Sequence, residues 1–157
     1  MEITQQIIFS VGEGEYSMNV ADVIGIESLT NVVPVPNAAS YILGIINLRG
    51  DVLPIYSLRN KFGLEEIPDD EHTKIIVTKS KDVAIAFKVD SVREIVEFEP
   101  ETMLDFPDIA RSEQTTYIEK VAKKDGRLVL LVNHNRLLAK EEREAISSFV
   151  SNASIHL

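Results

Sequence analysis

Short apolar runs separated by turn residues make up most of the chain before residue 135. The first two runs, 6–11 and 16–20, flank the sequence Gly-Glu-Gly-Glu. This arrangement predicts a β-hairpin, because two conformationally permissive glycines lie between two strand-like segments. Further strand-like runs cover 23–29 and 51–58. The hydrophobic pattern therefore favours β-structure from the start of the chain.

Three later runs are close together in the sequence. The runs 73–78 and 83–89 are separated by a short polar turn, which predicts a second hairpin. The run 92–98 follows at once. We expect these three strands to form a meander, in which each strand pairs with the next.

The last hairpin is predicted from 116–122 and 128–132, where Gly126 supplies the positive φ that a tight turn requires. Helical signals are few. The segment 59–62 forms one turn before a glycine, and 140–150 is a charged stretch with apolar residues near a 3.6-residue period, which predicts a C-terminal helix. About ten short strands at roughly 8–12 residue spacing indicate an all-β sandwich or barrel.

An acidic, proline-containing stretch at 65–71 divides the chain. Each part contains a glycine turn followed by a nearly continuous apolar strand, at 50–56 and 126–132. Such strands are typically buried on both faces. We therefore expect a single domain over the whole chain, made of two linked β-barrels with approximate bounds 15–64, plus a C-terminal part, and 73–135. Crossing of the N-terminal strand from one barrel to the other is an open alternative.

The composition excludes several kinds of protein. With 157 residues and a net charge of -9, the chain lacks the basic surface that nucleic-acid binding requires. It has no cysteine, which excludes disulfides and thiolate metal sites. The N-terminus does not resemble a signal peptide, and the uncharged run 28–48 contains two prolines and several polar side chains. We interpret that run as a buried or partner-covered segment of a soluble cytoplasmic protein without direct membrane insertion.

Residues that commonly carry out catalysis or bind metals are scattered. The three histidines, His72, His134 and His156, are far apart, and none has a second histidine four residues away. No nucleophile elbow, phosphate-binding glycine loop or pair of carboxylates is present. We expect no enzyme activity, no metal and no cofactor. The alternative is an acidic β-barrel enzyme that uses His72 or His134, which requires a catalytic pair in a shared cleft.

The segment 36–55 carries the most specific pattern in the chain. It reads PNAASYILGIINLRGDVLPI, with an Asn-Leu-Arg-Gly corner between an apolar stretch and a proline-containing strand. Its cation, Arg49, is the only lysine or arginine among the first 58 residues. Further patterns are V-D-S-V-R-E-I at 89–95 and G-R-L-V-L-L-V at 126–132, and Glu15-Tyr16 begins the second strand of the first hairpin.

Together these segments resemble the CheW family, the coupling proteins of bacterial chemotaxis. The resemblance extends over nearly the whole chain. It implies a pair of five-stranded SH3-like β-barrels without catalytic activity. It also implies a role as an adaptor between the cytoplasmic tip of a methyl-accepting receptor and the regulatory domain of the histidine kinase CheA, in the cytoplasm at membrane receptor arrays. A non-flagellar chemosensory pathway is an open alternative.

The resemblance also implies two binding faces. By motif position, the kinase-facing residues are Val23, Gly25 and Gly44. A glycine at 44 suits a place where another backbone comes close. Gly25 departs from the family, which often has Glu there. The alternatives are that Val23 is a core residue and that Gly44 serves only a bulge.

The implied receptor-facing residues are Arg49, Val92 and Ile95. Receptor tips are helical hairpins, so the expected contact is an amphipathic helix in an apolar groove between the barrels. In that contact, Arg49 binds a receptor carboxylate. The alternatives are core roles for Val92 and Ile95, and an internal ion pair between Arg49 and an acid such as Asp51.

Two further departures from the family pattern lie at turns. Ser57 and Asn133 stand where the family has Asp. Both residues can accept the same local hydrogen bonds as Asp, so we expect each to cap a turn.

Overall fold

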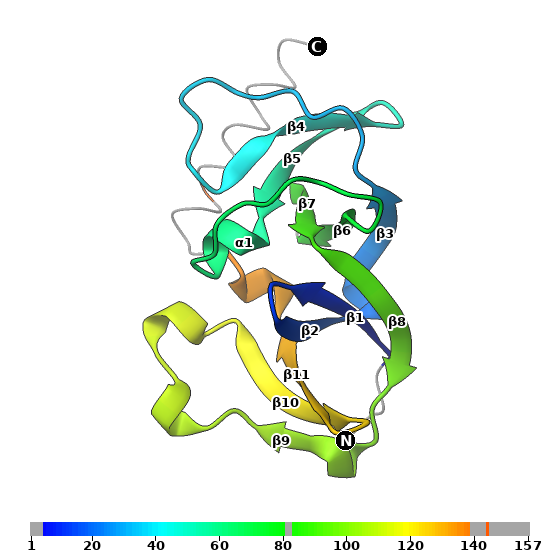
Figure 1. Cartoon of the computed structure of the whole chain (residues 1–157), viewed down its shortest axis with the longest axis vertical. Coiled ribbons are helices and arrows are strands. Elements are labelled where there is room, and N and C mark those ends of the chain that lie inside the picture. The colour runs from blue at the N-terminus through cyan, green and yellow to red at the C-terminus, as the bar shows by residue number, and fades with distance from the viewer. Residues whose placement is uncertain (1–4, 81–82, 139–143, 145–157) are drawn as a thin grey trace.

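The computed structural model describes residues 5–80, 83–138 and 144, and these residues form two β-sheets. Figure 1 shows the sheets one above the other along the long axis of the molecule. The five-stranded sheet has the order β3-β6-β7-β5-β4, with β3 (Val23–Ser28), β4 (Ile42–Leu48), β5 (Asp51–Ser57), β6 (Lys74–Ser80) and β7 (Val83–Val89). The six-stranded sheet has the order β8-β1-β2-β11-β10-β9, with β1 (Gln5–Val11), β2 (Gly14–Asn19), β8 (Ser91–Glu97), β9 (Met103–Asp105), β10 (Ile118–Lys124) and β11 (Arg127–Val132). The all-β prediction is confirmed for these residues.

Among the described residues up to 138, helical structure is limited to short turns. They are α1 (Leu58–Lys61) and the 3-10 helices η1 (Val20–Asp22), η2 (Pro100–Thr102), η3 (Asp108–Ala110), η4 (Glu113–Thr115) and η5 (His134–Arg136). The one-turn helix expected at 59–62 is thus confirmed to within a residue. The C-terminal helix expected at 140–150 lies outside the described residues, apart from Glu144.

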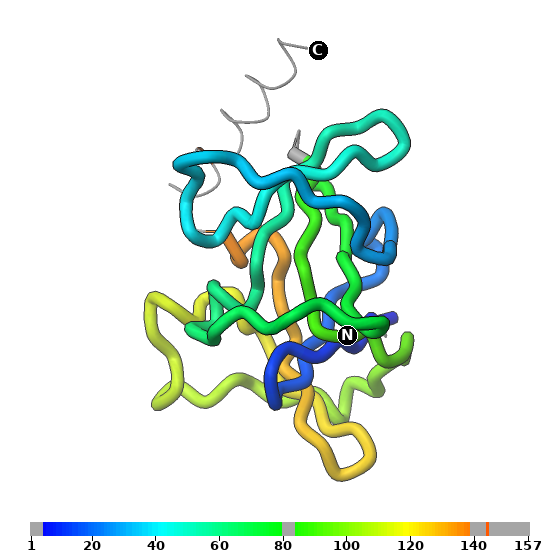
Figure 2. The backbone as a smooth tube through the Cα atoms, turned by 45° about the horizontal axis from the view of Figure 1, so that its top comes forward, coloured from blue at the N-terminus to red at the C-terminus, as the bar shows by residue number. Residues whose placement is uncertain are grey.

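The three predicted hairpins are confirmed. The pairs β1–β2, β6–β7 and β10–β11 are antiparallel. In the last of these, Asp125 and Gly126 have φ angles of 51° and 78°, as a two-residue hairpin turn requires. Figure 2 shows the β10–β11 and β4–β5 hairpins projecting at opposite ends of the molecule.

The predicted meander is wrong in its last step. Strand β8 does not pair with β7; it crosses to the other sheet and pairs antiparallel with β1. The reason is that β7 already has β6 on one side and β5 on the other, so it offers β8 no free edge. The chain turns at Asp90, whose backbone N–H donates to the carbonyl oxygen of Ser10 at 2.9 Å.

The strands are also sorted differently from the expected division at 15–64 and 73–135. Strands β6 and β7, at 74–89, join the sheet of β3, β4 and β5 through parallel pairing of β7 with β5. The N-terminal hairpin joins the later strands through parallel pairing of β2 with β11. The acidic stretch 65–71 therefore connects two strands of one sheet.

Within the described residues, the core consists of three apolar clusters. The largest lies between the sheets and takes residues from both, including Phe9, Tyr56 and Phe87. Each sheet also has a cluster of its own. On β6, Ile76 belongs to the central cluster, whereas its neighbour Ile75 belongs to the cluster of the five-stranded sheet. Strand β6 is thus buried on both faces, which accounts for its continuous apolar run.

Aromatic rings strengthen the junction between the sheets. Phe62, directly after α1, stacks on Tyr16 of β2 and on Tyr117, with ring centroids 4.7 and 5.4 Å apart. Burial, and secondarily the neighbouring Tyr16, raises the pKa of Tyr117 to about 12, and burial also raises the pKa of Tyr16. Both phenols therefore remain neutral in the physiological range.

An ion pair forms a second connection between the sheets. Nε and Nη2 of Arg59 donate to the two carboxylate oxygens of Asp90 at 2.9 and 2.7 Å, and the backbone N–H of Gly12 donates to Asp90 Oδ2 at 2.7 Å. Partial burial acts to raise the pKa of Asp90, but the hydrogen bonds from Arg59 and Gly12 outweigh it and hold the pKa below its ordinary value. One carboxylate thus joins α1 to the β1–β2 turn.

Candidate partner-binding surface

Arg49 lies at the tip of the β4–β5 hairpin. Arg49 and Gly50 form a two-residue turn with φ angles of 53° and 91°. The side-chain oxygen of Asn47 accepts a hydrogen bond from the backbone N–H of Gly50 at 2.9 Å, which fixes the turn. The guanidinium group projects from this corner, and the Arg49 side chain is 75% exposed.

The guanidinium group contacts an acid on a distant strand. Nη2 of Arg49 lies 2.7 Å from Oε1 of Glu27, near the end of β3, and Glu27 is only 24% exposed. The internal partner is therefore Glu27 and not Asp51, the acid suggested by proximity in the sequence. The contact places the β4–β5 turn beside β3, although these strands lie at opposite ends of the sheet order.

Strand β3 is an edge strand, and a β-bulge between Val23 and Gly25 interrupts its alternation. Val23 is half-buried and packs against the central apolar cluster, and Gly25 and Glu27 are half-buried on the other face. Ile24 and Ile26 are 63% and 36% exposed. Val23 therefore contributes to the core, and the two isoleucines, which the sequence analysis did not single out, are exposed.

Gly44 is buried, and the backbone that approaches it belongs to the same chain. A methyl group at position 44 would lie 2.4 Å from the carbonyl oxygen of Val33, and the φ of Gly44 is +152°. Val33 and Ile45 exchange two backbone hydrogen bonds of 2.9 Å beside it. The close approach expected at Gly44 is thus present, but Val33 occupies it and forms the exposed surface there.

Val92 and Ile95 lie on β8, the edge strand of the other sheet, and differ in environment. Val92 packs against the central cluster, whereas Ile95 is 57% exposed. A β-bulge in the β1–β8 pair sets Val92 opposite Phe9 and Ile95 opposite Ile7, so the two side chains lie on the same face of β8 although they are three residues apart. In Figure 1, β8 and β3 lie on the same side of the molecule.

The structure thus brings together residues assigned to different faces. Gly25 and Arg49 are linked through Glu27, because a methyl group at Gly25 would lie 3.5 Å from Glu27 Oε1. Glu27 was missed by the sequence reasoning. Its signal was its position on the strand, two residues after Gly25 and hence on the same face.

Ser57 and Asn133 cap turns, as predicted. The Ser57 hydroxyl accepts a hydrogen bond from the backbone N–H of Asn60 at the start of α1. The Asn133 side chain accepts one from the backbone N–H of Asn135 at the start of η5.

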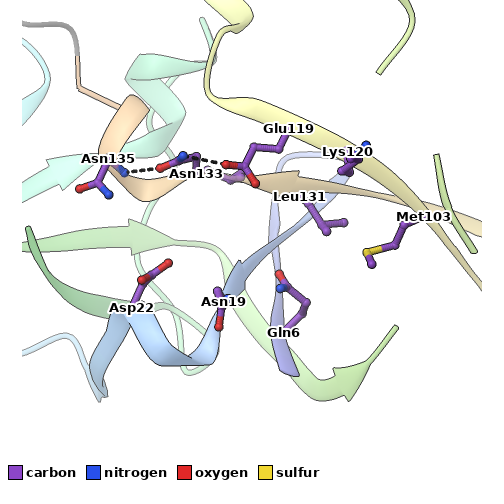
Figure 3. A pocket seen from close by; sticks show the side chains of 10 residues that line it. Gln6, Asn19, Asp22, Met103, Glu119, Lys120, Leu131, Asn133 and Asn135 are labelled. Carbon is purple, nitrogen blue, oxygen red and sulfur yellow. Dashed lines mark hydrogen bonds between the residues drawn. The ribbon is translucent and has the colours of Figure 1, made fainter. Parts of the chain in front are cut away.

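A polar cavity of about 320 Å³ lies between the N-terminal hairpin and the end of β11 (Figure 3). Its lining is rich in carboxamides and acids, namely Gln6, Asn19, Asp22, Glu119, Asn133 and Asn135. It contains no serine, threonine, tyrosine or cysteine among the described residues. Nδ1 of His134 lies 3.3 Å from Oδ2 of Asp22, but His134 is buried outside the lining. This contact joins η5 to η1.

His72 lies elsewhere, on the surface. It is exposed, and its Nε2 lies 3.3 Å from Oε1 of Glu71. Within the described residues, no three His, Asp or Glu side chains are placed to share a metal ion. No helix in the described part of the chain is long and apolar enough to cross a bilayer.

Comparison with known proteins gives a consistent family. A family model described as the CheW-like domain matches residues 5–142. The chemotaxis protein CheW of Rhizobium meliloti is 34% identical over 139 residues, which cover 88% of this chain and 90% of that protein. The chemotaxis protein CheW of Bacillus subtilis is 29% identical over 141 residues, covering 90% of each chain.

The fold also resembles a solved structure. The crystal structure of the scaffolding protein TtCheW from Thermoanaerobacter tengcongensis superposes with a TM-score of 0.78. The likeness covers 87% of this chain and 92% of that chain, at 24% identity.

Proposed function

Because this chain belongs to the family of CheW-like domains, the chemotaxis coupling proteins, we propose that it is a noncatalytic adaptor between a chemoreceptor and a kinase. In this proposal, it couples the cytoplasmic tip of a methyl-accepting chemotaxis receptor to the regulatory domain of the histidine kinase CheA. It works in the cytoplasm, at receptor arrays, and each sheet curls as an SH3-like barrel. The same adaptor chemistry would serve a non-flagellar chemosensory pathway.

The observation that carries the proposal is the position of Arg49. Its turn is fixed by backbone and side-chain hydrogen bonds, yet the guanidinium group is exposed at a projecting corner. A guanidinium group in this setting can bind a carboxylate through two parallel hydrogen bonds. Arg49 is the only lysine or arginine in the first 58 residues.

Apolar surface near the sheet edges supports docking of a receptor helix. Ile26 on β3 is paired with buried Ile76, and Ile95 on β8 is paired with buried Ile7. Directly paired residues point to the same face, so each exposed isoleucine extends a buried apolar surface to a sheet edge. In the proposed complex, the apolar face of the receptor helix covers Ile95 beside Val92, and a receptor carboxylate binds Arg49.

The proposed kinase-facing surface is on the five-stranded sheet. It comprises β3 at Val23 and Gly25, and the part of β4 at Gly44, which Val33 covers. Val23 contributes by packing β3 onto the core. Gly44 contributes because its missing side chain lets the backbone of Val33 lie against β4. Val33 is exposed, so it presents an apolar side chain to the kinase.

Replacing Arg49 tests the receptor contact. We expect Arg49→Ala to weaken binding of a receptor-tip helical hairpin by about 1–3 kcal/mol, because a charge-assisted hydrogen bond is lost. Kinase binding should stay nearly unchanged. Isothermal titration of each partner separately checks both statements. Equal losses for the two partners, or none for the receptor, would contradict a receptor-facing arginine.

Replacing Val33 tests the kinase surface. Gly44→Asp is a poor choice, because any side chain at position 44 would meet the Val33 backbone. Val33→Asp instead places a charge on the exposed side of the same contact. We expect it to reduce kinase binding about tenfold or more, since a charge buried in an apolar interface loses its hydration, and to leave receptor binding unchanged. Unchanged kinase affinity in the folded variant would place the kinase elsewhere.

A further inference from the structure

The ion pair between Glu27 and Arg49 is asymmetric. The Glu27 side chain is 24% exposed, whereas the Arg49 side chain is 75% exposed. Glu27 extends from a hydrogen-bonded strand, and Arg49 extends from the tip of a hairpin turn. The carboxylate is therefore the better-held member of the pair, and the guanidinium group is the member whose position depends on its partner.

The missing side chain at Gly25 makes room for this contact. Gly25 and Glu27 alternate on the same face of β3. A methyl group at position 25 would already be in van der Waals contact with Glu27 Oε1, at 3.5 Å. The Glu27 side chain thus extends across Gly25, and its carboxylate contacts Arg49. A longer side chain at position 25 would compete with Glu27 for that space.

The contact leaves most of the guanidinium group available. A guanidinium group has five N–H donors, and only Nη2 of Arg49 donates within the described part of the chain. The remaining donors are on the exposed side of a side chain that is otherwise free to rotate. An arginine held at one nitrogen loses less conformational entropy on binding than one that is held nowhere.

We propose that Glu27 is a positioning residue, which holds Arg49 from the side of β3 so that its outer donors meet a carboxylate of the receptor helix. This inference rests on the proposed function. It assigns to Glu27 a role in receptor affinity that acts only through Arg49. The final arrangement in the complex is a guanidinium group between two carboxylates, one from each protein.

A double-mutant cycle tests the proposal. The variants are Glu27→Gln, Arg49→Ala and the two combined, and the probe is the helical-hairpin tip of a chemoreceptor encoded in the same genome. We expect Glu27→Gln to weaken binding about 2- to 12-fold, the equivalent of ordering one long side chain. In the Arg49→Ala background, the same change should have no further effect. Glu101→Gln, an exposed acid in the 3-10 helix η2, is the matched control.

A spectroscopic readout separates positioning from general stability. The NMR order parameter of the Arg49 Nε–Hε bond should fall in Glu27→Gln and remain unchanged in Glu101→Gln, while the unfolding midpoint moves little in either variant. An order parameter that does not change in Glu27→Gln would overturn the positioning role.

The outcomes distinguish this inference from the proposed function. If Arg49→Ala weakens receptor binding but Glu27→Gln does not, or if the two losses add, the positioning role is overturned and the receptor contact stands. If Arg49→Ala leaves receptor binding unchanged, both the receptor contact and the positioning role are overturned.

Discussion

A methyl group at position 44 would meet the carbonyl oxygen of Val33 at 2.4 Å, whereas a methyl group at position 25 would lie 3.5 Å from Glu27. The two glycines thus have different physical roles. Gly44 is required by the close approach of Val33 and by its positive φ. Gly25 leaves space over which a neighbouring side chain extends.

Alanine substitution separates these two roles. We expect Gly44→Ala to lower the free energy of unfolding by about 1–3 kcal/mol, because Val33 must move and the backbone is strained. Gly25→Ala should be neutral or stabilise by up to about 1 kcal/mol, since its contact is ordinary and the unfolded chain loses freedom. Urea unfolding of both variants checks this. Similar losses in the two would contradict the assignment.

The sequence predicts part of the candidate site at this scale. The Asn-Leu-Arg-Gly corner indicates an exposed turn, because Arg49 precedes a glycine between two apolar strands. The partner Glu27 lies 22 residues earlier, and only the curvature of the sheet brings it close. Likewise, no local pattern predicts that Val33 covers Gly44, because a proline-rich connection has no period that fixes where it packs.

At the scale of single elements, α1 depends on one buried hydroxyl. Ser57 accepts a hydrogen bond from the backbone N–H of Asn60 at 3.0 Å and donates one to Glu66. Ser57 is both the last residue of β5 and the N-cap of α1. The helix in turn positions Phe62 and Arg59, which connect the two sheets.

Removing this hydroxyl should therefore cost more than removing an exposed cap. We expect Ser57→Ala to lower the free energy of unfolding by about 1–2 kcal/mol. Ser112→Ala, at the exposed start of η4, is the control and should have a smaller effect. Thermal unfolding followed by circular dichroism measures both. Equal effects would mean that the cap of α1 is not important for the junction.

The elements with strong turn signals were predicted, and those defined by distant pairing were not. Gly126 marks the β10–β11 hairpin because positive φ is needed at that point. In contrast, Val92 begins an apolar run directly after β7. Because β7 is already paired on both edges, this strand pairs with β1 instead, and no local pattern indicates that. Strand β9 was missed because three residues are too few to show a period.

At the scale of the whole molecule, the connection between the sheets includes an ionisable group. Asp90 binds Arg59 and the Gly12 amide, and its pKa is held below the ordinary value of 3.8. Its stabilising contribution is therefore fully present above the ordinary pKa and is lost as the pH falls through the lowered pKa.

Asp90→Asn should reveal this contribution. We expect the variant to lose about 1–3 kcal/mol of unfolding free energy near neutral pH, since charged hydrogen bonds are weakened. It should also depend less on pH below about pH 4 than the unmodified chain does. Asp105→Asn is the control, because that acid is also ion-paired but exposed. Urea unfolding at several pH values measures the curves; identical slopes for Asp90→Asn and the unmodified chain would contradict the prediction.

The interleaved order of the two sheets determines when each can form during synthesis. All strands of the five-stranded sheet lie between Val23 and Val89, so it can assemble as soon as that part has left the ribosome. The N-terminal hairpin is made first but must wait, because β2 ends at Asn19 and its neighbour β11 begins at Arg127. At about 5–20 residues per second, the delay is roughly 5–20 seconds. Throughout that time the edge of β2 that faces away from β1 is unpaired, so it is open to pairing with other nascent chains.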